Sequence, residues 1–185
     1  MPIAALDTPR LHIREVTATD AAGFLAYMQE QAYWQSVPID PPTPDSIAAM
    51  VAARLTEQAA DPRTGYFLAA TDRQSGQVIG EAILHIRSLR WRQGEIGWGV
   101  ADGRTGQGLA TEIGQAMLRL AFEQLHLHRV YAQCRFENQA SRRVMEKLGL
   151  RQEGVLRDNV LARGAWWSSA QYAILDAEWR GGAAE

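Results

Sequence analysis

A glycine-rich turn near the middle of the chain has the residues best suited to hold an anion. Gly103, Gly106 and Gly108 lead into a helix that is predicted by an apolar stripe at Leu109, Ile113, Ala116, Met117 and Leu120. Glycine allows backbone conformations in which several N–H groups point at one anion, and the first helical turn adds unpaired N–H groups. Either a pyrophosphate site or a tight strand-to-helix connection without a ligand fits this turn alone.

Three classes of phosphate ligand use turns of this kind. A P-loop requires lysine and then serine or threonine after the last glycine, where Leu109 and Ala110 stand instead. A dinucleotide fold requires a third glycine where Thr111 stands, and an acidic residue after the next strand, for which Glu137 is an imperfect candidate. Coenzyme A requires the pyrophosphate site and, beside it, a strand edge for its pantetheine arm.

The strand before the turn favours coenzyme A. Regular alternation over residues 95–100 places Gly97 and Gly99 on one face together with Glu95, and the larger side chains on the other. Glycines within a strand often mark the close approach of another group to the backbone. A strip without side chains that begins at a carboxylate and ends at an anion site suits the narrow pantetheine arm of coenzyme A. The bulky ring of a redox dinucleotide would fit there less well.

The remaining periodicity predicts the elements that position this turn. Thr19 is expected to cap a helix that runs to about Tyr33, residues 37–44 are expected to form a proline-rich loop, and a second helix is expected to begin at Asp45 or Ser46. Strands are expected at about 11–16, 66–71, 77–87, 94–101, 130–136, 151–158 and 167–175, with a short helix at 138–148. The order βααβββαβαββ predicts one α+β domain over residues 1–185, with its core at about 8–180, built on a mixed, mostly antiparallel sheet with flanking helices.

Composition excludes several other functions. A net charge of −2 disfavours nucleic acid as a partner. Cys134 is the single cysteine, so intramolecular disulfides and thiolate-rich zinc sites are excluded, and we expect it to be a small buried apolar side chain. The four histidines lack zinc-site spacing, so no metal is expected. No basic leader or apolar run of membrane length is present, so we expect a cytoplasmic protein without a membrane partner.

Two blocks of sequence resemble the GNAT superfamily of N-acetyltransferases, in particular its RimJ/RimL-like branch. Residues 103–111 are similar to the acetyl-CoA loop of the family, residues 128–157 are similar to its second conserved block, and residues 8–14 look like its opening strand. The resemblance implies a GNAT-like fold. It also implies a coenzyme site formed by Trp98, Val100, Gly103, Arg104, Thr105, Gly106, Gln107, Gly108, Leu109, Ala110, Thr111, Asn138 and Ser141.

Three positions depart from the family pattern. Gly103 stands where many members have glutamine or arginine, so the phosphates are expected to rest on backbone N–H groups, with Arg104 as a charge partner. Met145 stands where many members have a tyrosine general acid, whereas Ser141, one turn earlier, matches the serine that takes this role in the RimJ/RimL-like branch. Ser168 and Ser169 follow the tryptophan pair of the last strand, where the family often has aspartate.

The resemblance implies an acetyl-CoA-dependent N-acetyltransferase that moves the acetyl group directly to a primary amine, either a protein N-terminus or a small molecule. Glu95 is the candidate general base, although a surface ion pair with an arginine is an equal alternative. Ser141 is the candidate proton donor to the thiolate, and Asn138 either joins it or caps the helix. Backbone N–H groups near Trp98 and Val100 are candidates to stabilise the oxyanion. A non-catalytic acyl-CoA-binding module on the same fold is the alternative, and the chain is expected to be a monomer or homodimer.

Overall fold

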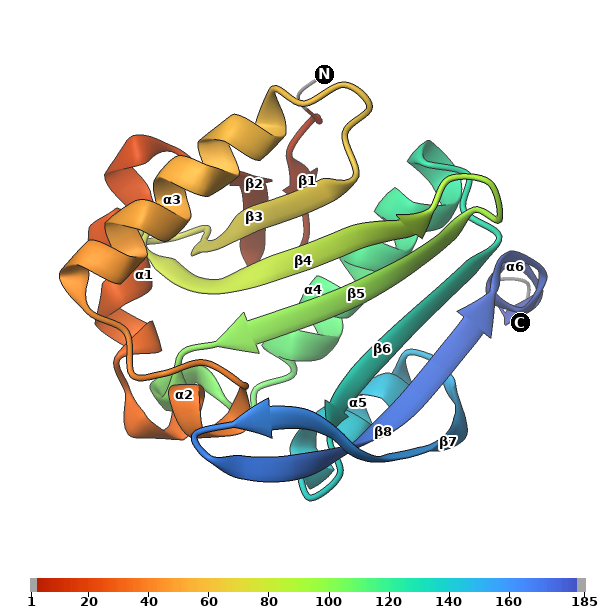
Figure 1. Ribbon diagram of the computed structural model, residues 1–185. Helices are drawn as coiled ribbons and strands as arrows, with labels where there is room; N and C mark the ends of the chain where they lie inside the picture. The colour runs from red at the N-terminus through yellow and green to blue at the C-terminus, as the bar shows by residue number, and fades with distance from the viewer. Residues whose placement is uncertain (1–2, 183–185) are drawn as a thin grey trace.

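The computed structural model describes residues 3–182 of the chain. Its eight strands form one sheet in the order β1-β2-β3-β4-β5-β6-β8-β7, and every neighbouring pair is antiparallel except β5 and β6 (Figure 1). This confirms the predicted α+β class and the mixed, mostly antiparallel sheet. The strands are β1 Leu6–Asp7, β2 Leu11–Glu15, β3 Gly65–Asp72, β4 Val78–Ser88, β5 Gln93–Val100, β6 Arg129–Arg135, β7 Arg151–Ala162 and β8 Ala165–Leu175.

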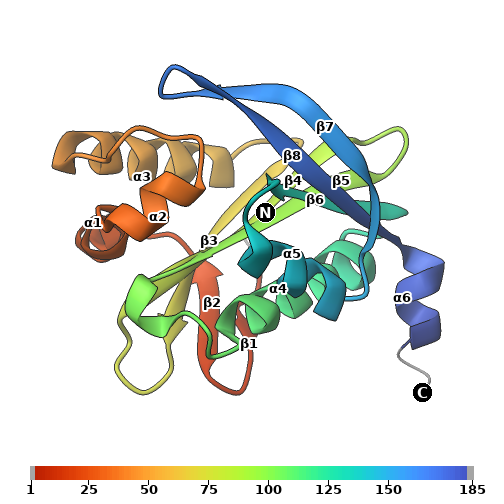
Figure 2. The same ribbon diagram turned by 90° about the horizontal axis from the view of Figure 1, so that it is seen from below.

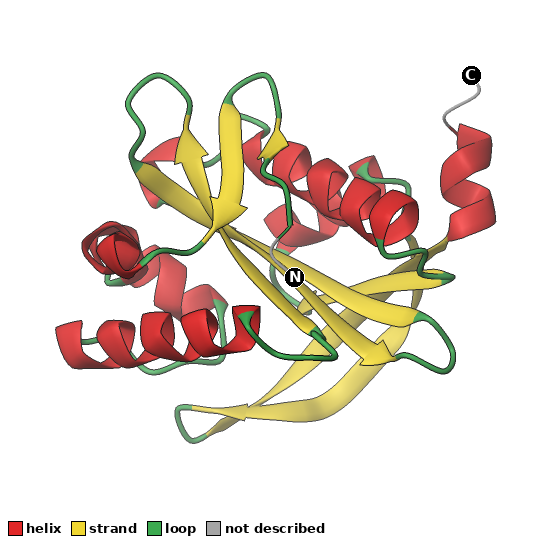
Figure 3. Ribbon diagram, turned by 90° about the horizontal axis from the view of Figure 1, so that it is seen from above, coloured by secondary structure: helices red, strands yellow, loops and turns green. Residues whose placement is uncertain are grey.

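Helices cover both faces of the sheet. The three helices that precede β3 lie on one face, and α4 and α5 lie on the other (Figures 2 and 3). Within the described residues, no helix is both long enough and apolar enough to cross a bilayer. The helices are α1 Ala21–Met28, α2 Gln31–Ser36, α3 Pro44–Gln58, α4 Leu109–Arg119, α5 Gln139–Lys147 and α6 Asp176–Gly182, with a π-helical turn at Leu120–Gln124 after α4.

The prediction of one continuous helix from Thr19 to Tyr33 is wrong. A 3-10 turn at Ala18–Asp20 precedes α1, and Glu30 adopts an extended conformation that separates α1 from α2. Thr17 is the N-cap residue of the 3-10 turn and Asp20 is that of α1, so Thr19 caps neither element. The Thr17 N–H donates to the Asp20 carboxylate at 2.7 Å. The chain breaks here because the buried end of α1 packs against the sheet whereas no residue of α2 is buried.

The second helix starts slightly earlier than predicted. Thr43 is the N-cap residue of α3, and Pro44 occupies its first turn, where a missing N–H costs nothing. The short strand β1 and the C-terminal helix α6 were not predicted. A strand of two residues is too short to show an alternating pattern.

Two apolar cores hold the layers together. The larger core lies between the sheet and α4, and it contains the complete predicted stripe of Leu109, Ile113, Ala116, Met117 and Leu120. The smaller core lies between the sheet and helices α1 and α3, and it includes Phe24, Ile47, Val51 and Phe67. Strand β4 therefore has one face toward α4 and the other toward α1.

Candidate active site

The parallel pair β5 and β6 separates halfway along β5. The ladder between them consists of Gln93 with Arg129, Gly94 with Val130 and Glu95 with Tyr131. Strand β5 then continues to Val100 while it remains paired with β4, and β6 runs away from it (Figure 1). Among the strands of residues 3–182, none pairs with the β5 edge beyond Glu95 on the β6 side.

The glycine turn lies directly after this open edge. Gly106 and Gly108 have positive φ angles of 73° and 82°, and Gly108 is the N-cap residue of α4. Within residues 3–182, the backbone N–H groups of Gly106, Gln107 and Gly108 have no hydrogen-bond acceptor. The N–H groups in the first turn of α4 have no acceptor within the helix, and they point along the helix axis toward the glycine turn.

The turn also has open space beside it. A Cβ atom added at Gly106 would meet nothing within 4 Å, and the same holds at Gly103. Unpaired N–H groups, a helix N-terminus and an open side fit a pyrophosphate group. Gly103 differs from the other two glycines because it lies in the 3-10 turn Asp102–Arg104 and its φ angle is not positive.

A buried carboxylate on α4 fixes the turn to the first strands. Glu112 accepts hydrogen bonds from the Thr8 hydroxyl, the Arg10 backbone N–H at 2.9 Å and the Arg10 Nε at 2.8 Å. Arg10 Nη1 in turn donates to the carbonyl of Gln107 at 2.7 Å, within the glycine turn. Sequence reasoning missed Thr8, Arg10 and Glu112 as a group, because Arg10 and Glu112 lie 102 positions apart.

Hydrogen bonds keep Glu112 ionised. Burial by itself would raise the pKa of the Glu112 carboxyl, but the bonds from Thr8 and Arg10 outweigh that effect, and the pKa is lowered. The carboxylate is therefore an anion at neutral pH and holds Arg10 against the turn.

The expected phosphate partner Arg104 points elsewhere. Its Nη1 lies 3.4 Å from the Asp72 carboxylate, at the turn between β3 and β4. Thr105 donates its hydroxyl hydrogen to the carbonyl of Asp102 at 2.9 Å, and Gln107 Nε2 donates to the carbonyl of Gly103 at 3.3 Å. These bonds lie within the turn, so the groups that it offers to an anion are its backbone N–H groups.

Helix α5 brings Asn138 and Ser141 to the end of β6. The Asn138 Oδ1 accepts from the Ser141 N–H at 3.0 Å, so Asn138 is the N-cap residue, as one of the two interpretations of this residue predicted. Cys134 of β6 is half-buried beside Ser141, and burial raises the pKa of its thiol despite the opposing effects of Ser141 and Arg142. Met145 is completely buried in the larger core.

Glu95 has a guanidinium partner. Its Oε2 accepts from Arg87 Nε at 2.7 Å and lies 2.6 Å from Arg87 Nη2. The Tyr131 hydroxyl donates to the same oxygen at 3.3 Å. The structure thus places Glu95 in the ion pair that the sequence left as an alternative to a catalytic role.

A second carboxylate, Glu81 of β4, was not singled out from the sequence. It lies on the same face of the sheet as Glu95, because Glu81 is opposite Gly99 in the β4–β5 register and His85 is opposite Glu95. Its carboxylate accepts hydrogen bonds from the Tyr27 hydroxyl and, at 2.7 Å, from the Tyr33 hydroxyl. The alternation of β4 does not reveal these partners, which belong to α1 and α2.

The hairpin of β7 and β8 reaches across to α2 (Figure 1). At its tip, Arg163 donates to the carbonyls of Val37, at 3.1 Å, and Ile39. The Arg163 guanidinium also lies over the rings of Trp34 and Trp167, with its central carbon 5.5 Å and 4.7 Å from the ring centres. The tip of the hairpin is therefore bonded to the segment that follows α2.

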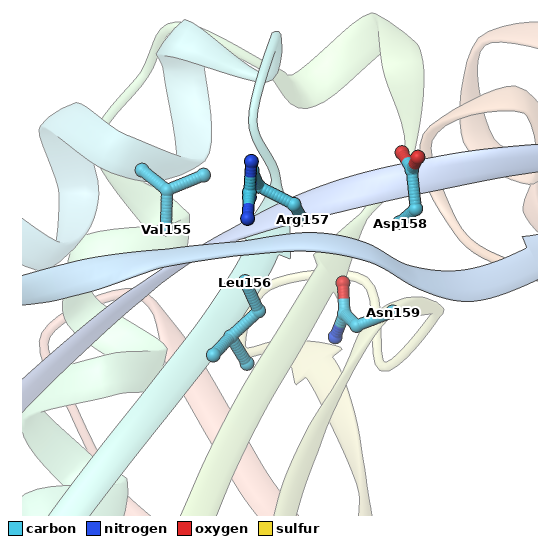
Figure 4. Close-up of a pocket in the computed structure, with 5 residues that line it drawn as sticks. All are labelled: Val155, Leu156, Arg157, Asp158 and Asn159. Carbon is cyan, nitrogen blue, oxygen red and sulfur yellow. The ribbon is translucent and has the colours of Figure 1, made fainter.

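An open hollow lies on the irregular part of β7. It is lined by Val155, Leu156, Arg157, Asp158 and Asn159, and Leu156 and Asn159 point to the opposite side of the strand from the other three (Figure 4). The register of β7 against β8 shifts between Leu156 and Val160. Ser168, one of the serines at the position where the family often has aspartate, accepts a hydrogen bond from the Asp158 N–H at 3.1 Å.

The chain is similar in sequence and in fold to known N-acetyltransferases. The uncharacterised N-acetyltransferase YnaD of Bacillus subtilis (strain 168) is 41% identical over 85 residues, which are 46% of this chain and 50% of that relative. The chain thus matches about half the length of this curated relative. A GNAT-family acetyltransferase from Bacillus anthracis has a TM-score of 0.82 at 26% identity, and the match covers 94% of this chain and 99% of the other.

Mycobacterium smegmatis RimJ, solved in complex with CoA-disulfide, shares the fold. Its TM-score is 0.80 at 22% identity, and the match covers 99% of this chain and 93% of that structure. Residues 10–151 match the family model described as the acetyltransferase (GNAT) domain. With most of its length inside that match, the chain belongs to the GNAT acetyltransferase domain family.

Proposed function

We propose that this protein transfers the acetyl group of acetyl-CoA to a primary amine by direct attack within a ternary complex. The observation that carries the proposal is the open edge of β5 beyond Glu95, which is followed, after the 3-10 turn Asp102–Arg104, by the N–H groups at Gly106–Gly108. The pyrophosphate rests on these N–H groups, and the pantetheine arm lies along the strand edge. Trp98 and Val100 offer backbone groups there, and the CoA-disulfide bound in the structure of Mycobacterium smegmatis RimJ supports the same class of donor.

Ser141 supplies a proton to the departing sulfur in this proposal. The residue lies in the first turn of α5, the helix that follows β6, and β6 is the strand that separates from β5. The Asn138 side chain caps the helix through the Ser141 backbone N–H and does not use the Ser141 hydroxyl. Met145 is fully buried and has no proton to donate.

A panel of amines tests the function. Protein and acetyl-CoA are mixed with a thiol reagent and an N-terminal peptide, a polyamine, a free amino acid or an aminoglycoside. Sustained release of CoA with at least one amine is expected. Binding of acetyl-CoA without release with any amine would instead support a non-catalytic acyl-CoA-binding module, which Met145 at the usual tyrosine position favours.

Gly108→Trp tests the coenzyme site. The indole fills the space beside the turn, and we expect isothermal titration calorimetry to detect no acetyl-CoA binding. Gly164→Trp is the matched control, because Gly164 has a similar φ angle of 75° and open space around it, but lies at the tip of the β7–β8 hairpin. Unchanged acetyl-CoA affinity in a folded Gly108→Trp variant would contradict the assignment of the turn.

A further inference from the structure

Glu81 is a buried carboxylate without a cation. Its residue is 3% exposed, and within residues 3–182 its side chain has the Tyr27 and Tyr33 hydroxyls as hydrogen-bond donors and no ion-pair partner. The other buried acids differ, because Asp20 pairs with Arg14 and Glu112 pairs with Arg10. An ionised carboxylate removed from water is costly unless a positive group compensates it. The site around Glu81 therefore suits a positively charged ligand group.

Glu81 also lies against the part of β5 that has left β6. A Cβ atom at Gly99 would lie 2.6 Å from the Glu81 Cδ, so glycine at this position is what allows the carboxylate to rest on the backbone of β5. At Gly97 the same atom would lie 3.8 Å from the nearest side chain. Gly99 is four residues beyond Glu95, or about 13 Å along the strand, and so closer to the glycine turn.

Helix α2 covers this carboxylate only lightly. Tyr33 comes from α2, which has no buried residue, and its ring meets the ring of Tyr27 edge to face at 5.3 Å. Tyr27 is 3% exposed and belongs to the smaller core. Displacement of Tyr33 alone therefore gives access to Glu81 while Tyr27 stays in place.

We propose that Glu81 binds the ammonium group of the acceptor and accepts its proton, with Tyr33 as the side chain that the acceptor displaces. This inference rests on the proposed function. The ammonium of the acceptor transfers one proton to the Glu81 carboxylate and becomes a neutral amine. The amine lone pair forms the new C–N bond, and the C–S bond breaks. Ser141 gives its hydroxyl proton to the sulfur, and the second proton from nitrogen restores the Ser141 hydroxyl. Glu81 returns its proton to water when the amide leaves.

Electrostatics supports this role for Glu81 over Glu95. Burial raises the pKa of the Glu81 carboxyl, while the hydrogen bonds from Tyr27 and Tyr33 act in the opposite direction. Burial and the nearby Glu81 charge raise the pKa of both tyrosines, which remain hydrogen-bond donors. The neighbours of Glu81 on β3 and β5 are Ala69 and Gly99, and neither titrates. Glu95 already has Arg87 as its cation.

Glu81→Gln and Glu95→Gln form the matched pair that tests the proposal. Both variants remove a charge from the same face of the sheet and keep the shape of the side chain. With the most active amine of the panel, kcat/KM of Glu81→Gln is expected to fall about 100-fold or more, as for the loss of a general base, and that of Glu95→Gln less than about tenfold. Acetyl-CoA affinity is expected to stay within about twofold of wild type in both.

Tyr33→Phe provides a measurement that does not depend on whether Glu81→Gln folds. Loss of one hydrogen bond to the ionised carboxylate raises the pKa of Glu81, so the acid limb of the kcat/KM profile is expected to move to higher pH. A folded Glu81→Gln variant with kcat/KM within about threefold of wild type would overturn the proposal. A Tyr33→Phe profile that superimposes on the wild-type profile would do so as well. CoA release by the wild type separately decides the proposed function.

Discussion

Glu112→Gln tests whether the carboxylate beneath the glycine turn holds that turn in place. The substitution keeps one acceptor oxygen but replaces the other with an amide group that faces the donors of Arg10. Hydrogen bonds to a charged group contribute about 1.5 to 3 kcal/mol each, but Arg10 is half-exposed, so solvent screening reduces the total. We expect the free energy of unfolding to fall by about 2 kcal/mol, or about 4 to 8 °C in Tm for a chain of this size.

The effect has a definite pH dependence. Because the pKa of Glu112 is lowered in the folded protein, its stabilisation is complete above the ordinary value of 4.5 and disappears as pH falls through the folded value. Denaturant unfolding should thus give a constant difference between wild type and Glu112→Gln from pH 6 to 8, and a shrinking one in acid. The matched control is Glu123→Gln, since Glu123 is an exposed residue in the turn after α4.

The same substitution should also weaken the coenzyme site. Arg10 loses the carboxylate that directs it toward the Gln107 carbonyl, and acetyl-CoA affinity is expected to fall about tenfold, which corresponds to about 1.4 kcal/mol. Calorimetry measures this directly. If Glu112→Gln matches the wild type in both unfolding free energy and acetyl-CoA affinity, the carboxylate does not position the turn and the reasoning is refuted.

Two further substitutions test the two sides of the site. Ser141→Ala should lower kcat about 100-fold with nearly unchanged acetyl-CoA affinity, since it removes the hydroxyl but keeps the backbone N–H that Asn138 caps. Turnover at the wild-type rate would remove Ser141 from the mechanism. Arg163→Ala should raise the KM for the amine several-fold with little change in kcat, because the β7–β8 hairpin loses its bonds to the segment after α2. Arg163→Lys restores the charge but not the stacking on Trp34 and Trp167, so its KM is expected to stay raised. If Arg163→Ala has the KM of the wild type, the contact between the hairpin and the segment after α2 does not affect binding of the amine.

The sequence by itself determined the features that depend on neighbouring residues. The apolar stripe of α4 predicted its buried face, because helical spacing brings those side chains together in any context. The cap formed by Asn138 was one of two interpretations that the sequence offered, and the glycines predicted a turn in which Gly106 and Gly108 have positive φ angles. These features require contacts across only a few residues, so local sterics and hydrogen bonding specify them.

Tertiary structure decided which charged groups meet. Glu81 receives its hydrogen bonds from residues 48 and 54 positions earlier, and Glu112 holds Arg10 from 102 positions away. The direction of Arg104 toward Asp72 and the pairing of Glu95 with Arg87 depend on how turns and strands pack side by side. The point at which β5 leaves β6 depends on how the sheet twists and packs on its helices, which no window of sequence contains. Local sequence therefore specified the glycine turn, whereas long-range packing specified which carboxylate lies beside the open strand edge.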